Sequence, residues 1–444
     1  LCMSSSVASY SRGFGFDGPP CCYGDLEKTD CSFLIGTNTA DCHPIVFNRL
    51  KNHHKKNKKV KLIVVDPRRT ATAKDADLHL AIKPGTDIAL LNGIAHLLIR
   101  WGKHDPLFID YCTDGFAEYA QVVSDYPPKR VADMCGISQE DVRLAATLWA
   151  NSENVLSLWS MGVNQSTEGT AKVRTIINLH LMTQNIGRAG AGPFSLTGQP
   201  NAMGGREAGG LAHILPGYRL VKKPAHRQAV ERVWQLPEGS ISPVPGLAAW
   251  DMMLALEREE VGVFWVAATN PAVSMPDIER TKAALLKSPF TICQDAYYPT
   301  ETAAYAHVVL PAAQWGEADG VMTNSERMVT LCPAFRDPVG KAMPDWAIFA
   351  EVGRRLGFTQ QFDFADAAAV YDEFVSLTAG RLCAMSGLSH ERLAKSGPIQ
   401  WPAPICETDE TAAAKFDKRL STDYRFPTDN GRAKFSAFPP KGLA

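Results

Sequence analysis

Long apolar runs and the compact motifs of several enzyme classes are missing from this sequence. No apolar run approaches the roughly 18 residues that a bilayer-spanning helix needs. No glycine fingerprint of the standard Rossmann kind joins an expected strand to a helix, and no P-loop is present, which disfavours a plain NAD-dependent dehydrogenase. The eleven cysteines include no CxxC pair, which argues against a self-contained zinc or iron–sulfur site.

A strong charge imbalance is also missing. The formal net charge is −1, so the composition indicates neither a nucleic-acid partner nor an anionic membrane surface. Hydrophobic residues make up 45% and charged residues 21%, as in ordinary globular enzymes. Cysteines scattered singly along the chain fit buried thiols in a reducing compartment. We expect the chain to be a fragment, because it begins without an initiator Met and ends without a clear closing element.

What the sequence does contain is a repeated unit of a short apolar run and a polar loop. The expected strands are residues 31–35, 61–65, 155–159, 261–267 and 290–293. Each is mostly apolar, which is typical of strands that are buried on both faces of a parallel sheet. Amphipathic helical patterns separate them, at 87–101, 170–183 and 344–356 among others. This alternation predicts two doubly wound α/β domains.

A segment rich in charge and proline at 222–245 is the candidate linker between these domains. We therefore expect a first α/β domain at 1–225 and a second at 226–400. Beyond Trp401 the composition turns to Pro, Asp and Thr, which indicates the start of a third module at 401–444. Open α/β sheets bind ligands beyond the carboxyl ends of their strands, so the polar loops that follow the strands form the candidate site.

Two features of these loops favour a large, phosphate-bearing ligand. Asp66, Asp87 and Asp295 each follow or adjoin an expected strand end, where carboxylates can accept hydrogen bonds from guanine. Alone, each would more often be an N-cap or turn residue, so the indication lies in their joint placement. A glycine-rich run at 187–207 allows close backbone approach to a ligand, and it contains Arg206, whose guanidinium suits an oxyanion.

These motifs resemble, in order, one known family. The opening segment at 1–8 resembles the one that carries the metal-ligating Cys in nitrate reductases with a molybdenum bis(molybdopterin guanine dinucleotide) cofactor. Further matching segments are 18–23, 36–44, 66–73, 83–87, 159–165, 197–207, 269–271, 294–302, 310–312 and 323–327. The resemblance spans nearly the whole chain and is closest to the cytoplasmic, assimilatory type of nitrate reductase.

The resemblance implies roles for individual residues. Cys2 corresponds to the molybdenum ligand, and a thiolate is a soft donor suited to such a metal. Met3 and Arg206 match residues that line the substrate funnel near the metal. The implied cofactor contacts are Ile35, Gly36, Thr37, Asn38, Thr39, Ala40, Asp41, Cys42, Asp66, Pro67, Arg68, Arg69, Thr70, Gly85, Thr86, Asp87, Met161 and Gln165 in the first domain, and Asn270, Gln294, Asp295 and Asp345 in the second.

The resemblance also implies parts that lie outside this chain. An upstream domain of the family holds a [4Fe-4S] cluster, and a downstream β-barrel, whose start would fall in 401–444, completes the pterin site. The implied reaction is reduction of nitrate to nitrite by oxygen-atom transfer. Electrons would come from ferredoxin, flavodoxin or a flavoprotein using NAD(P)H, in the cytoplasm and without a membrane or nucleic-acid partner.

Other members of the same superfamily remain alternatives. Formate dehydrogenases place His directly after the metal-ligating residue, whereas Met3 follows Cys2 here, which favours nitrate. Periplasmic nitrate reductases are closer, but many of them have Lys where Ala318 stands, and the loops at 66–68 and 201–206 look more like the assimilatory group. A non-catalytic relative would have lost the cofactor loops, whereas Cys2 and Arg206 are both intact.

Overall fold

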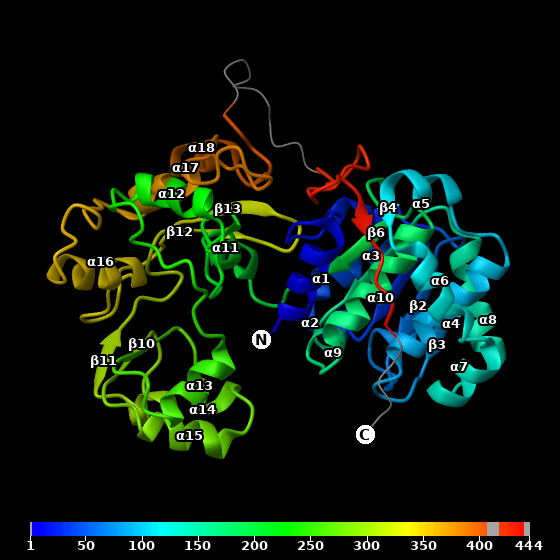
Figure 1. The fold of residues 1–444 in the computed structure, drawn as a ribbon, viewed down its shortest axis with the longest axis horizontal. Helices are drawn as coiled ribbons and strands as arrows, with labels where there is room; N and C mark the ends of the chain where they lie inside the picture. The colour runs from blue at the N-terminus through cyan, green and yellow to red at the C-terminus, as the bar shows by residue number, and fades with distance from the viewer. Residues whose placement is uncertain (1, 406–416, 439–444) are drawn as a thin grey trace. The chain divides into compact units, whose positions relative to one another are not determined.

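The computed structural model describes residues 2–405 and 417–438 and divides into two compact units (Figure 1). Unit 1 comprises Leu1–Met203, Asn324–Arg327 and Lys415–Ala444, and unit 2 comprises Gly204–Thr323 and Met328–Ala414. The chain thus first changes unit at Met203, ahead of the expected linker at 222–245. The domain bounds 1–225, 226–400 and 401–444 stay a prediction.

Unit 1 is built on a parallel sheet with the strand order β3-β2-β1-β5-β6. Its strands are β1 (Cys31–Ile35), β2 (Lys61–Val65), β3 (Leu78–Leu80), β5 (Val155–Trp159) and β6 (Gly192–Ser195). From β1 the chain moves outward through β2 to β3, then returns to β5 on the other side of β1. The strand order therefore reverses between β1 and β5, and such a switch point opens a crevice at the carboxyl ends of the two strands.

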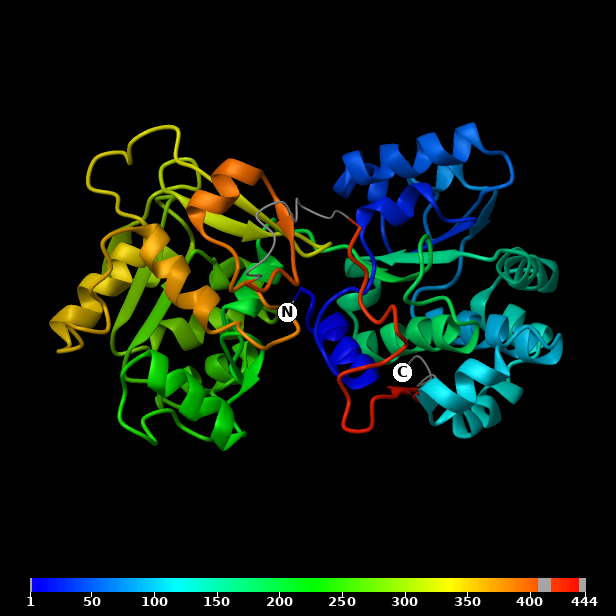
Figure 2. The same ribbon diagram turned by 90° about the horizontal axis from the view of Figure 1, so that it is seen from above.

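Helices cover both faces of this sheet (Figure 2). Alternate residues of a strand point to opposite faces, and both sets are buried here. Phe33 and Ile63 belong to a core cluster with Leu91 and Ile177, whereas Leu34 and Leu62 belong to a second cluster with Phe47. The helices of unit 1 are α1 (Ser4–Phe14), α2 (Thr39–Cys42), α3 (Pro44–Lys56), α4 (Asp87–Arg100), α5 (Pro106–Cys112), α6 (Phe116–Ser124), α7 (Pro128–Cys135), α8 (Gln139–Ala150), α9 (Met161–Asn164) and α10 (Gly169–Met182).

Unit 2 repeats the parallel arrangement on a smaller scale. Its parallel sheet has the order β11-β10-β9 and consists of β9 (Phe264–Ala267), β10 (Thr291–Asp295) and β11 (Val308–Pro311). An antiparallel sheet joins β12 (Gly320–Thr323), β13 (Met328–Cys332) and β14 (Ile399–Gln400), and a short hairpin pairs β7 (Ile214–Leu215) with β8 (Arg219–Leu220).

Helices also pack on the parallel sheet of unit 2. Met253 and Leu285 form a small core with Phe264 on β9, and the rings of Phe349 and Trp265 pack at a tilt with their centroids 4.8 Å apart. The helices are α11 (Ala202–Glu207), which begins just before the change of unit, α12 (Pro224–Val233), α13 (Ala249–Glu257), α14 (Pro271–Ser274), α15 (Ile278–Leu286), α16 (Asp345–Arg355), α17 (Ala367–Ser376) and α18 (His390–Ser396). The structure confirms the expected class of two α/β units with parallel sheets.

One GxGxxG spacing does occur in the sequence, at Gly13, Gly15 and Gly18, but it lies at a helix end. Helix α1 stops at Phe14, and Gly15 caps it in the left-handed conformation with φ of 83°. Only glycine adopts this conformation without strain. Because a helix and not a strand precedes these glycines, the spacing terminates a helix and is not a dinucleotide fingerprint.

Residues 417–438 of the expected third module pack within unit 1, whereas residues 401–405 belong to unit 2. Strand β15 (Ala433–Lys434) pairs in parallel with β4 (Thr113–Asp114), and the buried guanidinium of Arg174 donates to Ser436 Oγ at 3.1 Å. The expected start of a β-barrel falls partly on 406–416 and 439–444, outside the described residues. Within 2–405 and 417–438, no helix combines the length and the apolar character needed to cross a bilayer.

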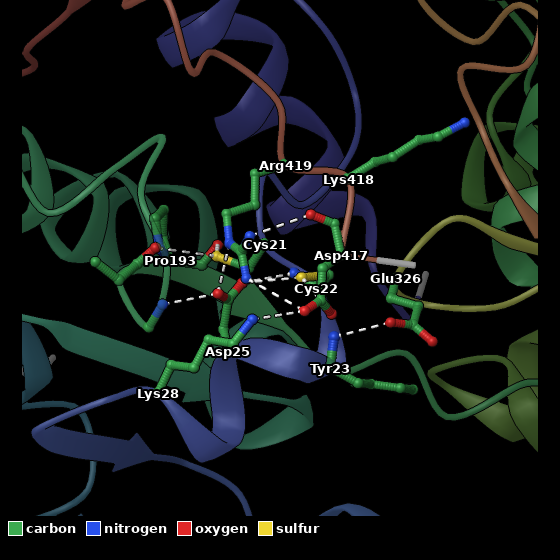
Figure 3. Close-up of polar contacts among 12 residues, drawn as sticks. Cys21, Cys22, Tyr23, Asp25, Lys28, Pro193, Glu326, Asp417, Lys418 and Arg419 are labelled. Carbon is green, nitrogen blue, oxygen red and sulfur yellow. Dashed lines mark hydrogen bonds and ion pairs between the residues drawn. The ribbon is translucent and has the colours of Figure 1, made fainter. Parts of the chain in front are cut away.

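A buried ion pair ties the returning segment to the first loop of unit 1 (Figure 3). Arg419 Nε donates to Asp25 Oδ1 at 2.6 Å, and the side chains are 13% and 0% exposed. The same carboxylate accepts the N–H groups of Cys22 at 2.8 Å and Gly190 at 2.7 Å. Asp25 therefore joins three segments that are distant in the sequence.

Candidate functional site

A pocket of about 1090 Å³ opens at the switch point of the unit 1 sheet. The loops after β1, β2 and β5 form its walls together with the N-termini of α4 and α10. Its lining consists of Gly36, Asn38, Cys42, His43, Val65, Asp66, Pro67, Arg68, Ile82, Pro84, Gly85, Asp87, Ser160, Met161, Gly162, Gln165, Ser166, Thr167, Glu168, Lys172, Leu196 and Gly198. The position is the one that doubly wound topology predicts for a ligand.

Two glycines allow the loops after β1 and β5 to approach each other closely at the base of this pocket. The N–H of Gly162 donates to the carbonyl of Gly36 at 3.0 Å. A Cβ atom on Gly162 would lie 2.7 Å from the Gly36 carbonyl oxygen, and one on Gly36 would lie 2.8 Å from the Val163 nitrogen. Gly36 also has φ of 57°, so the loops after β1 and β5 meet only because both positions lack a side chain.

The pocket gathers more than half of the cofactor contacts expected in the first domain. Those that line it are Gly36, Asn38, Cys42, Asp66, Pro67, Arg68, Gly85, Asp87, Met161 and Gln165. The remaining ones, which shape the same loops without lining the pocket, are Ile35, Thr37, Thr39, Ala40, Asp41, Arg69, Thr70 and Thr86. Ile35, for example, is a fully buried strand residue, and Thr86 Oγ1 donates to the Lys83 carbonyl at 2.6 Å.

Asn38 and Thr72 fix the conformation of the loop after β1. Asn38 Oδ1 accepts hydrogen bonds from Thr72 Oγ1 at 3.0 Å and from the Thr72 N–H at 3.4 Å, and Asn38 Nδ2 donates to Asp41. Thr72 Oγ1 in turn accepts the Ala40 N–H at 2.9 Å. After β2, Asp66 Oδ1 accepts the Arg68 N–H at 2.8 Å.

Unit 2 contains the same set of contacts at the ends of β9 and β10. Asn270 Oδ1 accepts from Thr302 Oγ1 at 2.5 Å and from the Thr302 N–H at 3.1 Å, and the Ala272 N–H donates to Thr302 Oγ1 at 3.1 Å. Asp295 Oδ1 accepts the Tyr297 N–H at 2.9 Å. Ala268, with φ of 54°, takes the place of Gly36. The two units thus carry one strand-end motif twice.

The remaining expected residues of unit 2 lie at this same edge. Gln294, the penultimate residue of β10, donates through Nε2 to Asp345 Oδ1 at 2.6 Å and accepts the Trp265 indole N–H at 3.2 Å. Asp345 begins α16. The structure therefore brings Gln294 and Asp345 into direct contact and holds Asn270 and Asp295 in the neighbouring loops.

A buried ion pair in the unit 1 pocket escaped the sequence reasoning. Lys172 Nζ lies 2.7 Å from Asp87 Oδ2, and the two side chains are 5% and 11% exposed. Lys172 sits in the first turn of α10, where the helical pattern marks it as part of a packed face. Asp87 was expected at the site, but only the fold shows that its carboxylate meets an ammonium group there. His43 and Ser160 also line the pocket and lie in the matching segments 36–44 and 159–165, although no role was assigned to them, whereas Glu168 lies in no matching segment.

Cys2 lies beside this pocket. Its Sγ is 3.0 Å from Met161 Sδ and 3.5 Å from Gln199 Oε1, and the residue is partly exposed. Met3, by contrast, is 5% exposed, and its Sδ accepts a hydrogen bond from Asn164 Nδ2 at 3.0 Å. The expected place of Met3 in a substrate funnel stays a prediction.

Asn164 holds the start of α1 against the loop after β5. Ser5 Oγ donates to the Asn164 carbonyl at 2.8 Å, and Ser6 Oγ donates to Asn164 Oδ1 at 2.7 Å. The indole N–H of Trp159 donates to Ser6 Oγ at 3.0 Å. Because all these groups are buried, their satisfied hydrogen bonds fix the position of the backbone that carries Cys2.

Arg206 lies in unit 2 and is 8% exposed. The next residue, Glu207, is fully buried and accepts hydrogen bonds from Trp401 Nε1 at 2.6 Å and Thr323 Oγ1 at 2.8 Å. These two bonds anchor the end of α11 within unit 2. The expected role of Arg206 toward an anion stays a prediction.

The chain is similar to nitrate reductases of several organisms. It is 64% identical over 444 residues to a nitrate reductase of Synechocystis sp., covering 100% of this chain and 62% of that protein. It is 38% identical over 416 residues to the periplasmic nitrate reductase of Desulfovibrio desulfuricans (91% and 55%). It is 35% identical over 440 residues to the assimilatory nitrate reductase catalytic subunit of Bacillus subtilis (99% and 60%). The chain thus spans less than two thirds of the length of these relatives.

The fold and a family model agree with these relatives. Acetylene hydratase from Pelobacter acetylenicus superposes with a TM-score of 0.73 at 21% identity, over 98% of this chain and 58% of that one, which shows a shared fold. The model of the molybdopterin oxidoreductase family matches residues 2–355. Because this match covers both strand-end motifs and the segment with Cys2, the chain belongs to the molybdopterin oxidoreductase family.

Proposed function

We propose that this chain is the central part of a molybdenum-dependent nitrate reductase that reduces nitrate to nitrite in nitrate assimilation. One observation carries the proposal: the chain is 64% identical, over its whole length, to a nitrate reductase. The geometry supports it, because the thiol of Cys2 lies against Met161 on the wall of a large strand-end pocket.

The residues of the unit 1 pocket fit a large pterin nucleotide. The pocket volume of about 1090 Å³ slightly exceeds the usual range for small-molecule sites, about 300–1,000 Å³. Lys172 and Arg68 supply positive charge for phosphates, and Asp66 and Asp87 supply carboxylates for guanine. The repeated motif of unit 2 offers a second edge of the same kind, which supports a cofactor with two guanine dinucleotides.

The donor set fits a metal that brings most of its ligands with the cofactor. Among the described residues, no group of three or more His, Cys, Asp or Glu side chains could hold a metal ion. Cys2 would therefore be the protein's thiolate donor, and thiolates suit soft metal centres. When bound, the molybdenum–pterin cofactor supplies the two-electron redox chemistry that removes an oxygen atom from nitrate.

The chain's own residues position this chemistry. The hydrogen bonds of Ser5, Ser6 and Met3 with Asn164 fix the turn that carries Cys2. Met161 covers one side of the thiol and limits its freedom. Such preorganisation matters because a donor that is misplaced by about 1 Å can cost two orders of magnitude in rate.

Replacing Arg206 tests the substrate side of the proposal. We expect Arg206→Ala to lower kcat/KM for nitrate by about 100- to 1,000-fold, because a fixed guanidinium that attracts the anion and stabilises its shifting charge is lost. Arg206→Lys should recover part of the loss. Steady-state kinetics with a reduced dye, normalised to measured molybdenum content, gives the result.

The matched control is Arg258→Ala, which removes an exposed arginine of the same unit that pairs with the equally exposed Glu260. It should leave kcat/KM within about twofold of the wild type, since exposed pairs contribute little. An unchanged kcat/KM in a cofactor-replete Arg206→Ala enzyme would rule out the proposed role of this arginine.

The remaining assignments concern the whole protein. We propose a cytoplasmic, assimilatory enzyme with a [4Fe-4S] cluster in an upstream domain, reduced by ferredoxin, flavodoxin or a flavoprotein using NAD(P)H. Metal and pterin analysis of the full-length protein, with a reduced-dye assay on nitrate and formate in parallel, tests the reaction. Molybdenum with nitrate turnover is expected. Formate turnover alone, or activity without molybdenum and pterin, would replace this proposal with another function.

A further inference from the structure

Cys42 and His43 lie side by side on the wall of the unit 1 pocket. Cys42 is the exposed last residue of α2, and its Sγ is 3.1 Å from His43 Nδ1. His43 Nε2 lies 2.9 Å from the Thr197 carbonyl oxygen. Because a carbonyl oxygen only accepts, Nε2 carries a hydrogen, and Nδ1 is the nitrogen that exchanges a proton with the thiol.

The strand-end motif does not account for this pair. The equivalent helix of unit 2, α14, ends at Ser274, and Met275 follows it. Ser274 Oγ donates to the Asn270 carbonyl at 3.0 Å, so the loop is closed there without a thiol or an imidazole. The strand-end loop of unit 2 thus forms without a thiol or an imidazole, so the shared backbone geometry does not require the Cys42–His43 pair.

The surroundings of Cys42 favour its ionised form. Burial opposes ionisation, but the hydrogen bond and charge of His43, with a hydrogen bond from Thr37, lower the pKa of the thiol below its usual value. The hydrogen bond with Cys42 raises the pKa of His43. Both shifts favour a thiolate–imidazolium pair, and the thiolate is the nucleophilic form of cysteine.

The charged side chains near the Cys42–His43 pair and the other thiols of unit 1 give the comparison for the reactivity of Cys42. The other charged side chains that line the pocket are Asp66, Arg68, Asp87, Glu168 and Lys172, and Asp41 precedes Cys42 in the sequence. Two other thiols of unit 1 are buried and inert by comparison, since burial raises the pKa of Cys31 to about 12 and that of Cys135 to about 11.

We propose that Cys42 is a reactive thiol, activated by His43, that peroxides oxidise from the pocket. The thiolate attacks one oxygen of hydrogen peroxide, so that an S–O bond forms and the O–O bond breaks. The leaving hydroxide takes the proton of the His43 imidazolium and departs as water. The sulfur is oxidised to a sulfenic acid and the peroxide is reduced. The consequence rests on the proposed function: a bound cofactor covers the Cys42 thiol, and oxidation of this thiol hinders cofactor loading.

Alkylation kinetics of the full-length protein test the activation. The protein is prepared with and without molybdenum cofactor, pulsed with iodoacetamide between pH 5.5 and 8.5, and mapped by peptide mass spectrometry. Cys112, which is partly exposed and has a pKa raised by burial, is the internal comparison. In the cofactor-free protein at pH 6, we expect Cys42 to react at least about 10-fold faster than Cys112.

Two variants separate activation from mere exposure. His43→Gln keeps an N–H donor for Thr197 but exchanges no proton, so alkylation at pH 6 should slow about 10-fold and its pH midpoint should rise toward about 8.5. Cys42→Ser should abolish both the alkylation and the sulfenic-acid adduct that peroxide and a 1,3-dicarbonyl trap leave on this peptide. Cys31, on the same peptide, must stay unlabelled in a folded sample.

The outcomes are distinct. A Cys42 rate equal to that of Cys112, or equal in His43→Gln, overturns the proposal. If His43→Gln does not fold, a wild-type midpoint at or above about 8.5 overturns it as well. If activation holds but the cofactor-loaded protein reacts equally fast, the reactive thiol stands, and the placement of the cofactor in this pocket fails.

Discussion

The variant Cys2→Ala is expected to lose nitrate reduction almost completely while unit 1 stays folded. Cys2 is partly exposed, and its thiol contacts Met161 Sδ and Gln199 Oε1, so truncation of this small side chain removes little packing. On the proposed function it removes the protein's metal ligand. Changes in groups that merely support a ligand cost about 10- to 100-fold, so loss of the ligand itself should cost more than about 100-fold.

Two measurements on the full-length enzyme check this result. The dye-linked rate per molybdenum should collapse, and X-ray absorption should show one sulfur fewer around the metal. Cys112→Ala is the matched control, because Cys112 is another partly exposed thiol of unit 1 that lies outside the pocket lining. Equal sulfur coordination in wild type and Cys2→Ala would refute the ligand role, whatever happens to the rate.

The central strands of unit 1 were predictable because each is recognised from the apolar character of its own few residues. Residues 31–35, 61–65 and 155–159 are apolar on both faces, and they form β1, β2 and β5 with those bounds. β3 escaped prediction, since its three residues, Leu78–Leu80, include a histidine and are too few to show a period. β6 escaped because it begins at Gly192, inside a glycine-rich run that indicates a ligand loop.

The candidate site was predictable only as a set of loops. Parallel strands end at one edge, so the loops after β1, β2 and β5 had to meet, and their residues do line one pocket. Lys172 was hidden because helical periodicity alone marks it as a packed position, and its contact with Asp87 spans two helices. A sequence gives no signal for such a pairing.

The duplication of the strand-end motif was also hidden. Asn38 bonds Thr72 across 34 positions, whereas Asn270 bonds Thr302 across 32. The helix that joins the two strands differs in length and composition between the units, so no fixed period marks the repeat. What repeats is the backbone geometry, including a positive φ that glycine adopts in one unit and alanine in the other. Only the three-dimensional structure reveals that the two motifs are equivalent.

The variant Asp25→Ala is expected to lower the free energy of unfolding by about 3–5 kcal/mol, the usual effect of removing one partner of a buried ion pair. Its carboxylate accepts Arg419 Nε at 2.6 Å and the N–H groups of Gly190 and Cys22, as Figure 3 shows in part. Alanine would leave the guanidinium and both amides without this acceptor in a region that excludes water. The contacts of the segment 417–438 with unit 1 should weaken with it.

Chemical denaturation of the full-length protein measures this loss of stability, and two further variants serve as comparisons. Asp25→Asn keeps one carbonyl acceptor, so its loss should be intermediate. Glu260→Ala breaks the pair with Arg258, in which both side chains are 54% exposed, and should leave the stability nearly unchanged. If Asp25→Ala proved as mild as Glu260→Ala, the desolvation of the Asp25 carboxylate would already offset what its donors contribute, and other contacts, such as the Lys28–Asp417 pair, would hold the returning segment.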